Sequence, residues 1–465
     1  MSEQPAPKLG LLPLYLALYD RVAPEIRPRI DGFVCTIAQE FEKRGVHVES
    51  APVCRVRDEF AQAVASFEKA GVDALVTLHL AYSPSLESVE VIAATDIPVF
   101  VLDTTPTFEF GPEQSVGEIM YNHGIHGVQD LCNLLIRLGK PFRIEAGSWD
   151  HSDVIDRICE WVRAAHLAAK MRGSRVGRIA EPFVGMGDFA VPPEVLKRTI
   201  GVETVPADYA VLRSLMPEKD DPEVIAEMKA DLERFSCAGI DADTHAGTVQ
   251  SSLAVRRWME RENLSAFTMN FDAIDRSCGL SILPFLEASK SMARGIGYAG
   301  EGDVLTAALV GALASVHPET TFTEMFCPDW AGDRIFLSHM GELNPDLVVG
   351  KAELVEKSMP FLNTDTPALV VGRFKCGEAV FVNLAPGPED TFTLILAPVE
   401  MPEDGKEDMP GTVRGWFRPA MSVSQFLEAY SAVGGTHHAA LVYGDVLSEL
   451  SRFGELMGWD VAIIG

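Results

Sequence analysis

The chain has 465 residues, 47% of them hydrophobic, and a formal net charge of −28. A chain of this length is too long to fold around one hydrophobic core and suggests about three domains. The hydrophobic share is that of a packed globular protein. The negative charge excludes nucleic acid and anionic membrane surfaces as partners, because binding there depends on Lys and Arg neutralising phosphates. A neutral substrate or a cation fits this charge better.

No apolar run reaches membrane-spanning length, and residues 1–8 lack the basic-then-apolar layout of a signal peptide, so we expect a cytosolic protein. The eight cysteines are scattered, with no Cys-x-x-Cys pair. Buried reduced thiols are therefore expected, and zinc ribbons and redox motifs are not.

Short apolar runs alternate with helical patterns from residue 8 to residue 106. We expect strands at 9–14, 46–51, 74–80 and 98–103, and helices at 29–43, 59–70 and 86–94. Strands that alternate with helices at this spacing form right-handed βαβ units around a parallel sheet. Ligands of such sheets bind at the carboxyl ends of the strands, where residues 79–84 and 103–106 lie.

A helix at 152–171 and a polar break at Arg172-Gly-Ser-Arg175 indicate a domain boundary. A second αβ series follows, with strands at 176–180, 202–206 and 266–271. Beyond residue 317, strands follow one another with Gly and Pro turns, which favours an antiparallel barrel or sandwich. We predict an α/β protein with two parallel-sheet αβ domains, residues 1–172 and 173–316, and a β-rich C-terminal domain, residues 317–465.

A glycine-rich turn, Gly295-Ile-Gly-Tyr-Ala-Gly-Glu-Gly-Asp303, opens a predicted helix at 304–314. Glycines there permit positive φ and close approach of other groups. Glu301 and Asp303 would repel a phosphate from the helix N-terminus, so the turn favours a metal or proton-transfer site. Asp303 is explained equally well as a helix cap, but a cap does not account for Glu301.

Further candidate metal ligands lie downstream of Glu301, at Glu324 in an alternating strand, at His339 and at the adjacent His437 and His438. Strict alternation would put Glu324 on one face with Phe322 and Phe326, where a carboxylate is costly unless it is paired or bound to a cation. Two Glu and one or two His suit Mn²⁺, Mg²⁺ or Co²⁺. A satisfied core residue is the competing reading for each residue, and the sequence does not show that they converge.

His123 and His126 lie three residues apart at the start of a predicted helix, which would put them on one face. A metal pair and two ordinary polar residues of a first helical turn both fit this spacing.

The glycine-rich turn and its helix resemble the most characteristic motif of the L-arabinose isomerase family, where a Gly-Glu-Gly-Asp turn supplies a catalytic Glu. Other matches follow in the family's order over nearly the whole chain: Leu78-His-Leu-Ala-Tyr-Ser-Pro84, residues 122–127, Gly147-Ser-Trp-Asp150, Thr323-Glu-Met325, Ser338-His-Met340 and Gly434-Gly-Thr-His-His438. The chain is therefore identified as a divergent member of the L-arabinose and L-fucose isomerase superfamily.

The resemblance implies a Rossmann-like first domain, a second αβ domain and a β-rich third domain. It also implies a Mn²⁺ site, with Co²⁺ or Mg²⁺ as other possible metals, whose ligands map to Glu301, Glu324, His339 and His438. His437 would neighbour that site. Substrate-binding positions map to Tyr82 and Phe271, for which core packing explains the residues equally well, and to His126.

The implied reaction is aldose–ketose isomerisation of a sugar through a cis-enediol, with Glu301 and Glu324 as the acid and base in either order. In this family an adjacent subunit completes the site, and His126 matches the residue that reaches across, which implies a homo-oligomer, a trimer or hexamer.

Three substrate-lining regions depart from the family. Residues 325–330 replace an acidic and Tyr-rich run, Leu12-Pro-Leu-Tyr15 replaces a Gly-Ser-Gln loop, and His123 replaces a Gln. The substrate is thus L-arabinose-like or a related small sugar, and its identity stays open. A non-catalytic sugar-binding protein of the same fold and an L-fucose-isomerase-type enzyme are the alternatives.

Overall fold

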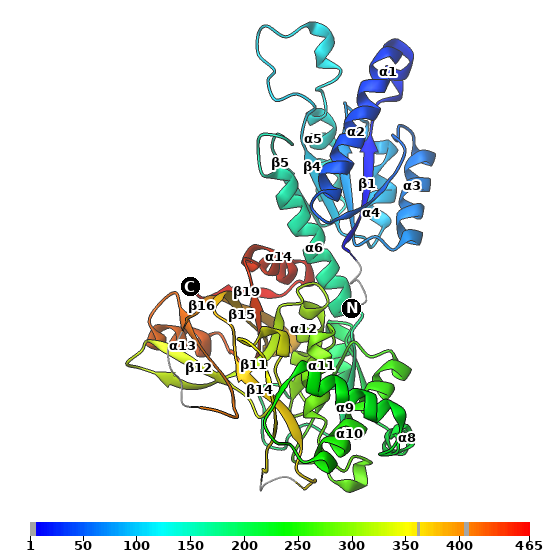
Figure 1. Ribbon diagram of the computed structural model, residues 1–465. Helices are drawn as coiled ribbons and strands as arrows, with labels where there is room; N and C mark the ends of the chain where they lie inside the picture. Colours follow the sequence, from blue (N-terminus) through cyan, green and yellow to red (C-terminus); the bar gives the residue numbers. More distant parts are fainter. Residues whose placement is uncertain (1–5, 360–362, 404–408) are drawn as a thin grey trace. The chain divides into compact units, whose positions relative to one another are not determined.

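The computed structural model describes residues 6–359, 363–403 and 409–465 (Figure 1). The chain divides into two compact units, which we call the N-terminal unit (Ser2–His166) and the C-terminal unit (Leu167–Gly465). The boundary falls within helix α6 (Val154–Arg172). In the described residues, no helix is both long enough and apolar enough to cross a membrane.

The N-terminal unit contains a five-stranded sheet in which every pairing is parallel. In spatial order the strands are β2 (His47–Ser50), β1 (Lys8–Leu14), β3 (Ala74–His79), β4 (Val99–Asp103) and β5 (Phe142–Ala146). The helices before α6 are α1 (Ala17–Val22), α2 (Arg27–Glu42), α3 (Arg57–Ala70), α4 (Val89–Ala94) and α5 (Ile125–Arg137).

One face of this sheet is covered by α3, α4 and α5. Phe60, Ile92 and Leu131, one from each helix, share a buried apolar cluster with Leu12 of β1 and Leu75 of β3. β3 is buried at every residue, as expected for a strand in the middle of a covered parallel sheet. Its carboxyl end leads into the 79–84 segment.

The C-terminal unit begins with a second parallel sheet, ordered β10 (Gly297–Gly300), β9 (Ala266–Met269), β6 (Arg175–Ile179) and β7 (Glu203–Pro206). Its helices are α7 (Pro193–Thr199), α8 (Tyr209–Leu215), α9 (Pro222–Arg234), α10 (Ala242–Glu262), α11 (Phe285–Ala293) and α12 (Val304–Ala314). Every residue of α12 is buried, so this helix forms part of the core of the unit.

The rest of the C-terminal unit is built on a closed antiparallel barrel. Six strands follow one another around it: β16 (Phe392–Met401), β15 (Gly377–Pro386), β18 (His438–Tyr443), β11 (Thr320–Asp329), β12 (Arg334–Ser338) and β17 (Val413–Pro419). Pairing of β16 with β17 closes the ring. The sheet is extended by β8 (Ser236–Cys237), β13 (Glu353–Glu356), β14 (Ala368–Arg373) and β19 (Asp460–Ile463), and helices α13 (Val423–Ala432) and α14 (Leu447–Met457) complete the unit.

These sheets confirm the predicted fold class of parallel αβ units followed by an antiparallel barrel. The division at residues 172 and 316 stays a prediction. Within the predicted glycine-rich turn, residues Gly297–Gly300 form a strand, so that reading was too broad. Strand β18 was not predicted, although it carries His438.

The expected face of β11 is wrong for Phe326. A β-bulge between Met325 and Cys327 interrupts the alternation, and Phe326 is exposed whereas Phe322 is fully buried. Phe326, between the paired residues Met325 and Cys327, is the extra residue of this bulge, so its side chain does not follow the alternation of the strand.

Candidate functional site

Glu301 follows the last residue of β10 and precedes the cap of α12. Its φ is +64°, a conformation that few residues other than glycine adopt, and the adjacent Gly302 has a φ of +86°. A Cβ at Gly302 would lie 2.6 Å from Pro182 Cα, so a larger residue does not fit there. The Phe183 amide donates to the Glu301 carbonyl over 2.9 Å. The backbone thus holds Glu301 in a strained conformation, a frequent property of functional positions.

Glu324 meets His438 across neighbouring strands. The register of β11 and β18 puts the two residues directly opposite each other. Glu324 Oε1 lies 2.9 Å from His438 Nε2, and Glu301 Oε2 lies 3.6 Å from the same nitrogen. Segments more than a hundred residues apart in the sequence therefore bring two carboxylates to one imidazole.

His339, immediately after β12, approaches the same carboxylate. Its Nε2 lies 3.1 Å from Glu324 Oε1. A Cβ at Gly300 would lie 3.1 Å from His339 Cε1 and 3.2 Å from its Nε2, so only glycine leaves the ring this position without displacement. Gly300, which precedes Glu301, thus makes room for the imidazole beside it.

His437 is the most accessible of the three histidines, with 36% of its side chain exposed. Its Nε2 lies 3.4 Å from Glu301 Oε2. Ligand atoms of Glu301, Glu324, His437 and His438 all lie within 4.8 Å of one another. His339 is not in this set of four, but its Nε2 lies 3.1 Å from Glu324 Oε1, so His339 and His437 are both candidates for the further ligand.

A carboxylate holds the Nδ1 atom of each histidine. The three pairs are His438 with Asp303 at 2.9 Å, His339 with Glu342 at 2.6 Å, and His437 with Asp188 at 2.6 Å. When each Nδ1–H donates to its carboxylate, Nε2 is the ring nitrogen that faces Glu301 or Glu324, where it can carry a proton or give its lone pair to a metal. This arrangement of carboxylate, imidazole and ligand position is characteristic of histidines that bind metals.

Glu342 connects two parts of this cluster. Its Oε2 accepts from His339 and from the Gly341 amide at 2.8 Å, and its Oε1 accepts the hydroxyl of Tyr298 at 2.8 Å. Tyr298 lies on β10, three residues before Glu301. Glu342 is fully buried, so these bonds tie the strand that carries Glu301 to the turn that carries His339.

The charges of the cluster are strongly coupled. Burial opposes ionisation of Glu324, but attraction to His339 and His438 outweighs it and holds the pKa of Glu324 well below its usual range. Burial also opposes the charged form of His438, yet the neighbouring carboxylates of Asp303 and Glu324 raise its pKa to about 9. The centre thus attracts positive charge, either as protons on the imidazoles or as a metal ion that replaces them.

Two atoms at the centre of the cluster lack hydrogen bonds. Within the described residues, Glu324 Oε1 and His438 Nε2 are buried and neither makes a hydrogen bond of acceptable geometry, although they lie 2.9 Å apart. A hydrogen-bonded ion pair would join them directly, whereas a shared cation would use both lone pairs. The mixed oxygen and nitrogen donors fit a divalent metal.

Aromatic rings surround the cluster. Phe189 stacks on His438 with ring centroids 5.0 Å apart, and Phe322 packs edge-on against His438 and His339. Phe271, a predicted substrate contact, packs against Phe183 at 5.7 Å. The Phe183 amide donates to the Glu301 carbonyl, so this aromatic pair is joined to the turn that carries Glu301.

Tyr82 and His126, the other predicted substrate contacts, belong to the N-terminal unit. They lie with His123 beyond the carboxyl end of β3, where the Tyr82 ring is 6.4 Å from that of His126. Their role in binding a sugar stays a prediction.

The sequence did not predict that Asp188, Asp303 and Glu342 would hold the histidines of the site. Asp303 was predicted only as part of the turn and as a helix cap. Asp303 does cap α12, accepting from the Thr306 amide, and uses its other oxygen for His438. Glu342 lies three residues after His339, a spacing that could have suggested the contact. Asp188 is 249 residues from His437, and no local pattern indicates that pairing.

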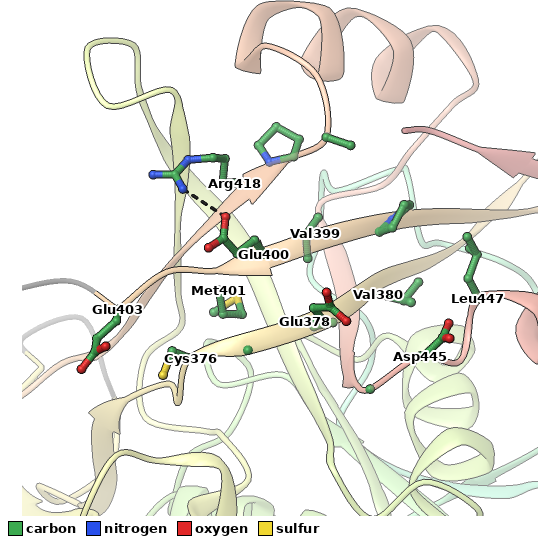
Figure 2. Close-up of a pocket in the computed structure, with 16 residues that line it drawn as sticks. Cys376, Glu378, Val380, Val399, Glu400, Met401, Glu403, Arg418, Asp445 and Leu447 are labelled. Carbon is green, nitrogen blue, oxygen red and sulfur yellow. Dashed lines mark hydrogen bonds and ion pairs between the residues drawn. The ribbon is translucent and has the colours of Figure 1, made fainter.

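A cavity of about 760 Å³ lies on the barrel (Figure 2), and none of its lining residues belongs to the cluster. It is lined by apolar residues such as Val380 and Val399 and by acidic residues such as Glu378 and Glu400, the latter paired with Arg418 at 3.1 Å. Chemistry requiring convergent acids and imidazoles is found in the cluster and not in this cavity.

Comparison with known proteins identifies the relatives of the chain. Residues 226–318 match the L-arabinose isomerase central domain and residues 319–460 match the L-arabinose isomerase C-terminal domain. The chain belongs to the L-arabinose isomerase family. The predicted resemblance is therefore confirmed, and the cluster lies within the part that matches, except for Asp188.

Full-length relatives of this family are similar over most of the chain. The L-arabinose isomerase of Herpetosiphon aurantiacus is 25% identical over 89% of this chain and 85% of its own length. That of Lactiplantibacillus plantarum is 27% identical over 74% of each, and that of Shouchella clausii 25% identical over 74% of this chain and 71% of its own. Family membership also confirms the predicted enzyme class, an intramolecular oxidoreductase.

Sugar-binding proteins are far weaker matches. A glucose-galactose binding protein from Geobacillus stearothermophilus is 15% identical, and the match covers 67% of this chain and 91% of that protein. Its TM-score of 0.16 is too low to indicate a shared fold.

We predict that Glu342→Gln weakens divalent-metal binding by roughly 10- to 100-fold, the usual effect of removing a carboxylate that orients a metal-binding histidine. Isothermal titration of the metal-free protein with Mn²⁺ or Co²⁺ measures the change. The exposed Glu400, paired with Arg418 at the surface, supplies the matched control Glu400→Gln, which should bind as the wild type does. Wild-type affinity in folded Glu342→Gln would contradict the assignment.

Proposed function

We propose that the protein is a metal-dependent aldose–ketose isomerase that moves a proton between adjacent sugar carbons through a cis-enediol. The convergence of Glu301 and Glu324 on His438, at 3.6 and 2.9 Å, carries this proposal. Isomerisation requires a base for the proton α to the carbonyl and an acid for the carbonyl oxygen. Two carboxylates on different walls of one site meet that requirement, and a protein that only binds sugar needs no such pair.

Glu301 and Glu324 are the proposed acid and base, in an order that kinetics must decide. Glu324 is held ionised by its imidazole neighbours, and Glu301 lies beside His437, which is accessible from outside. The strained backbone of Glu301 and the strand pairing of Glu324 fix both carboxylates before substrate arrives, which saves the cost of orienting them in the reaction.

Glu301, Glu324, His339 and His438 are the proposed ligands of a divalent cation, with Mn²⁺ as the expected ion and Co²⁺ or Mg²⁺ as alternatives. The carboxylate-held Nδ1 atoms of the histidines support this set, because they leave Nε2 free for bonding. Such an ion would polarise the carbonyl and hydroxyl oxygens of the sugar.

A neutral sugar is the proposed substrate, either L-arabinose-like or a related small sugar. Among the described residues, the ionisable side chains that contact Glu301 and Glu324 are histidines, and those histidines are in turn held by carboxylates. A phosphate or sugar acid would meet repulsion from this acidic surrounding. Phe271 offers an apolar surface of the kind that packs on the carbon face of a sugar.

The experiment that tests this function is a screen of aldoses and ketoses with Mn²⁺ and with chelator, read by formation of the isomeric sugar. We expect turnover of at least one small neutral sugar that chelator abolishes. Glu301→Gln, which is nearly isosteric, should lower kcat by about 100- to 10,000-fold while circular dichroism stays unchanged. Full turnover in that variant would overturn the assignment of Glu301.

We also infer that the enzyme is a homo-oligomer, a trimer or hexamer, in which His126 of one subunit completes the site of another. The 108–125 segment of the N-terminal unit supports this inference, because it exposes the large apolar residues Phe108, Phe110, Val116, Ile119 and Ile125. A run of exposed apolar side chains of this kind is typical of an interaction surface.

The double variant Val116→Asp/Ile119→Asp should dissociate the oligomer and lower turnover per chain by about tenfold or more, because charge is costly in an apolar interface. Sedimentation velocity gives the mass. Ile225→Asp, at an exposed position of α9, is the matched control and should leave the mass unchanged. Wild-type mass and activity in the double variant would remove this surface from the assembly.

A further inference from the structure

Three aromatic side chains form a chain of hydrogen bonds beyond the carboxyl end of the N-terminal sheet. Tyr19 of α1 contacts His123 Nδ1 through its hydroxyl at 3.3 Å, and His123 Nε2 lies 2.8 Å from His126 Nδ1. The ring centroids of the two histidines are 4.3 Å apart. His126 Nε2 is thus the ring nitrogen at the free end of the chain, on an exposed side chain.

The backbone fixes this arrangement against β3. A Cβ at Gly124 would lie 2.2 Å from the carbonyl oxygen of His79, and one at Gly127 would lie 2.7 Å from His79 Nδ1. These two glycines therefore let the segment with both histidines pack directly on the end of the strand. The close approach limits the freedom of the turn and holds the two rings within hydrogen-bond distance.

The 2.8 Å contact allows only one proton between the two rings. Burial, followed by repulsion from His126, lowers the pKa of His123, so His123 is neutral at neutral pH. A neutral imidazole has one donor and one acceptor nitrogen, which means that the direction of the first bond sets the direction of the second. The state of His126 therefore depends on whether Tyr19 donates or accepts.

A phenol is a good donor, and the lone pair of an imidazole nitrogen is a strong acceptor, so Tyr19 donates to His123 Nδ1. His123 then carries its proton on Nε2 and donates to His126 Nδ1. His126 in turn carries its proton on Nε2. Bonds that run in one direction strengthen one another. Asp130 does not compete, because it accepts from the Tyr82 hydroxyl and the Ser85 amide.

We propose that Tyr19 and His123 are positioning residues that fix the tautomer of His126 with its proton on Nε2, so that His126 donates a hydrogen bond to an oxygen of the sugar. The role of His126 towards sugar rests on the proposed function, whereas the hydrogen-bond chain does not. His123 stands where the family has a Gln. A glutamine amide, whose NH2 group is a donor and whose oxygen is an acceptor, can also donate to His126 Nδ1.

Tautomers can be read without any substrate. In solid-state ¹⁵N NMR of histidine-labelled holoenzyme, Nδ1–H and Nε2–H imidazoles give distinct signals, and His126→Gln assigns the signal of His126 by difference. We expect an Nε2–H signal for His126 in the wild type. In His123→Leu, which removes the donor, a mixture of tautomers should appear, and Tyr19→Phe should give a smaller shift in the same direction. An Nδ1–H signal in the wild type, or no change in both variants, would overturn the proposal.

Kinetics with the sugar found by the screen supply the second measurement. His123→Leu should raise KM by about tenfold with a much smaller effect on kcat, the loss expected for one orienting hydrogen bond. His123→Gln should recover most of this loss, because its amide restores a donor to His126 Nδ1. His47→Gln, at an exposed histidine outside the chain of bonds, is the control and should leave KM unchanged.

An unchanged KM in His123→Leu, or a glutamine variant as impaired as the leucine variant, would contradict the positioning role. If the wild type turns over no sugar, the proposed function fails, and the NMR measurement still decides whether the hydrogen-bond chain fixes the tautomer.

Discussion

The pairing of β11 with β18 brings Glu324 and His438, the two residues at the centre of the cluster, next to each other. Glu324 and His438 are opposite each other only in the observed register. A shift of one residue would turn either side chain to the other face of the sheet and separate Glu324 Oε1 from His438 Nε2. The remaining elements bring their residues to this pair: the β10 turn carries Glu301, and the residue after β12 is His339.

This concentration of acids is costly without a cation. Five carboxylates, those of Asp188, Glu301, Asp303, Glu324 and Glu342, contact only three imidazoles. Protonated histidines offset part of the repulsion, which is why the pKa of His438 is raised. A divalent ion would offset more of it and would occupy the lone pairs that Glu324 and His438 leave unused. The same acids favour the uncharged sugar that we propose as the substrate.

Much of the fold follows from local patterns. Apolar runs that alternate with helical patterns indicate the parallel sheets. Successive strand patterns separated by Gly and Pro turns after residue 317 indicate the barrel. The bulge at Met325 was not predictable, because it depends on pairing with β12 rather than on the residues of β11 themselves. The sequence did not predict strand β18, because its run of apolar residues is short and begins within the histidine pair.

The sequence predicts the two central carboxylates of the site but not the residues that orient its histidines. Glu301 and Glu324 are out of place by local physical chemistry, one in a glycine turn and one among apolar residues, so they attract notice in the sequence. The residues that orient the histidines do not attract notice in the sequence. Asp188 lies 249 residues before His437 in the chain, and Asp303 has the position of an ordinary helix cap. Non-local contacts of this kind become visible only when the chain is folded.

We propose that the cluster around Glu324 and His438 binds one divalent ion. Anomalous X-ray diffraction from crystals of the protein grown with Mn²⁺ tests it most directly. We expect a single strong anomalous peak per chain, within bonding distance of Glu301, Glu324 and His438 and of either His339 or His437, which also decides between those two histidines. A peak elsewhere on the chain, or none at saturating Mn²⁺, would contradict the account.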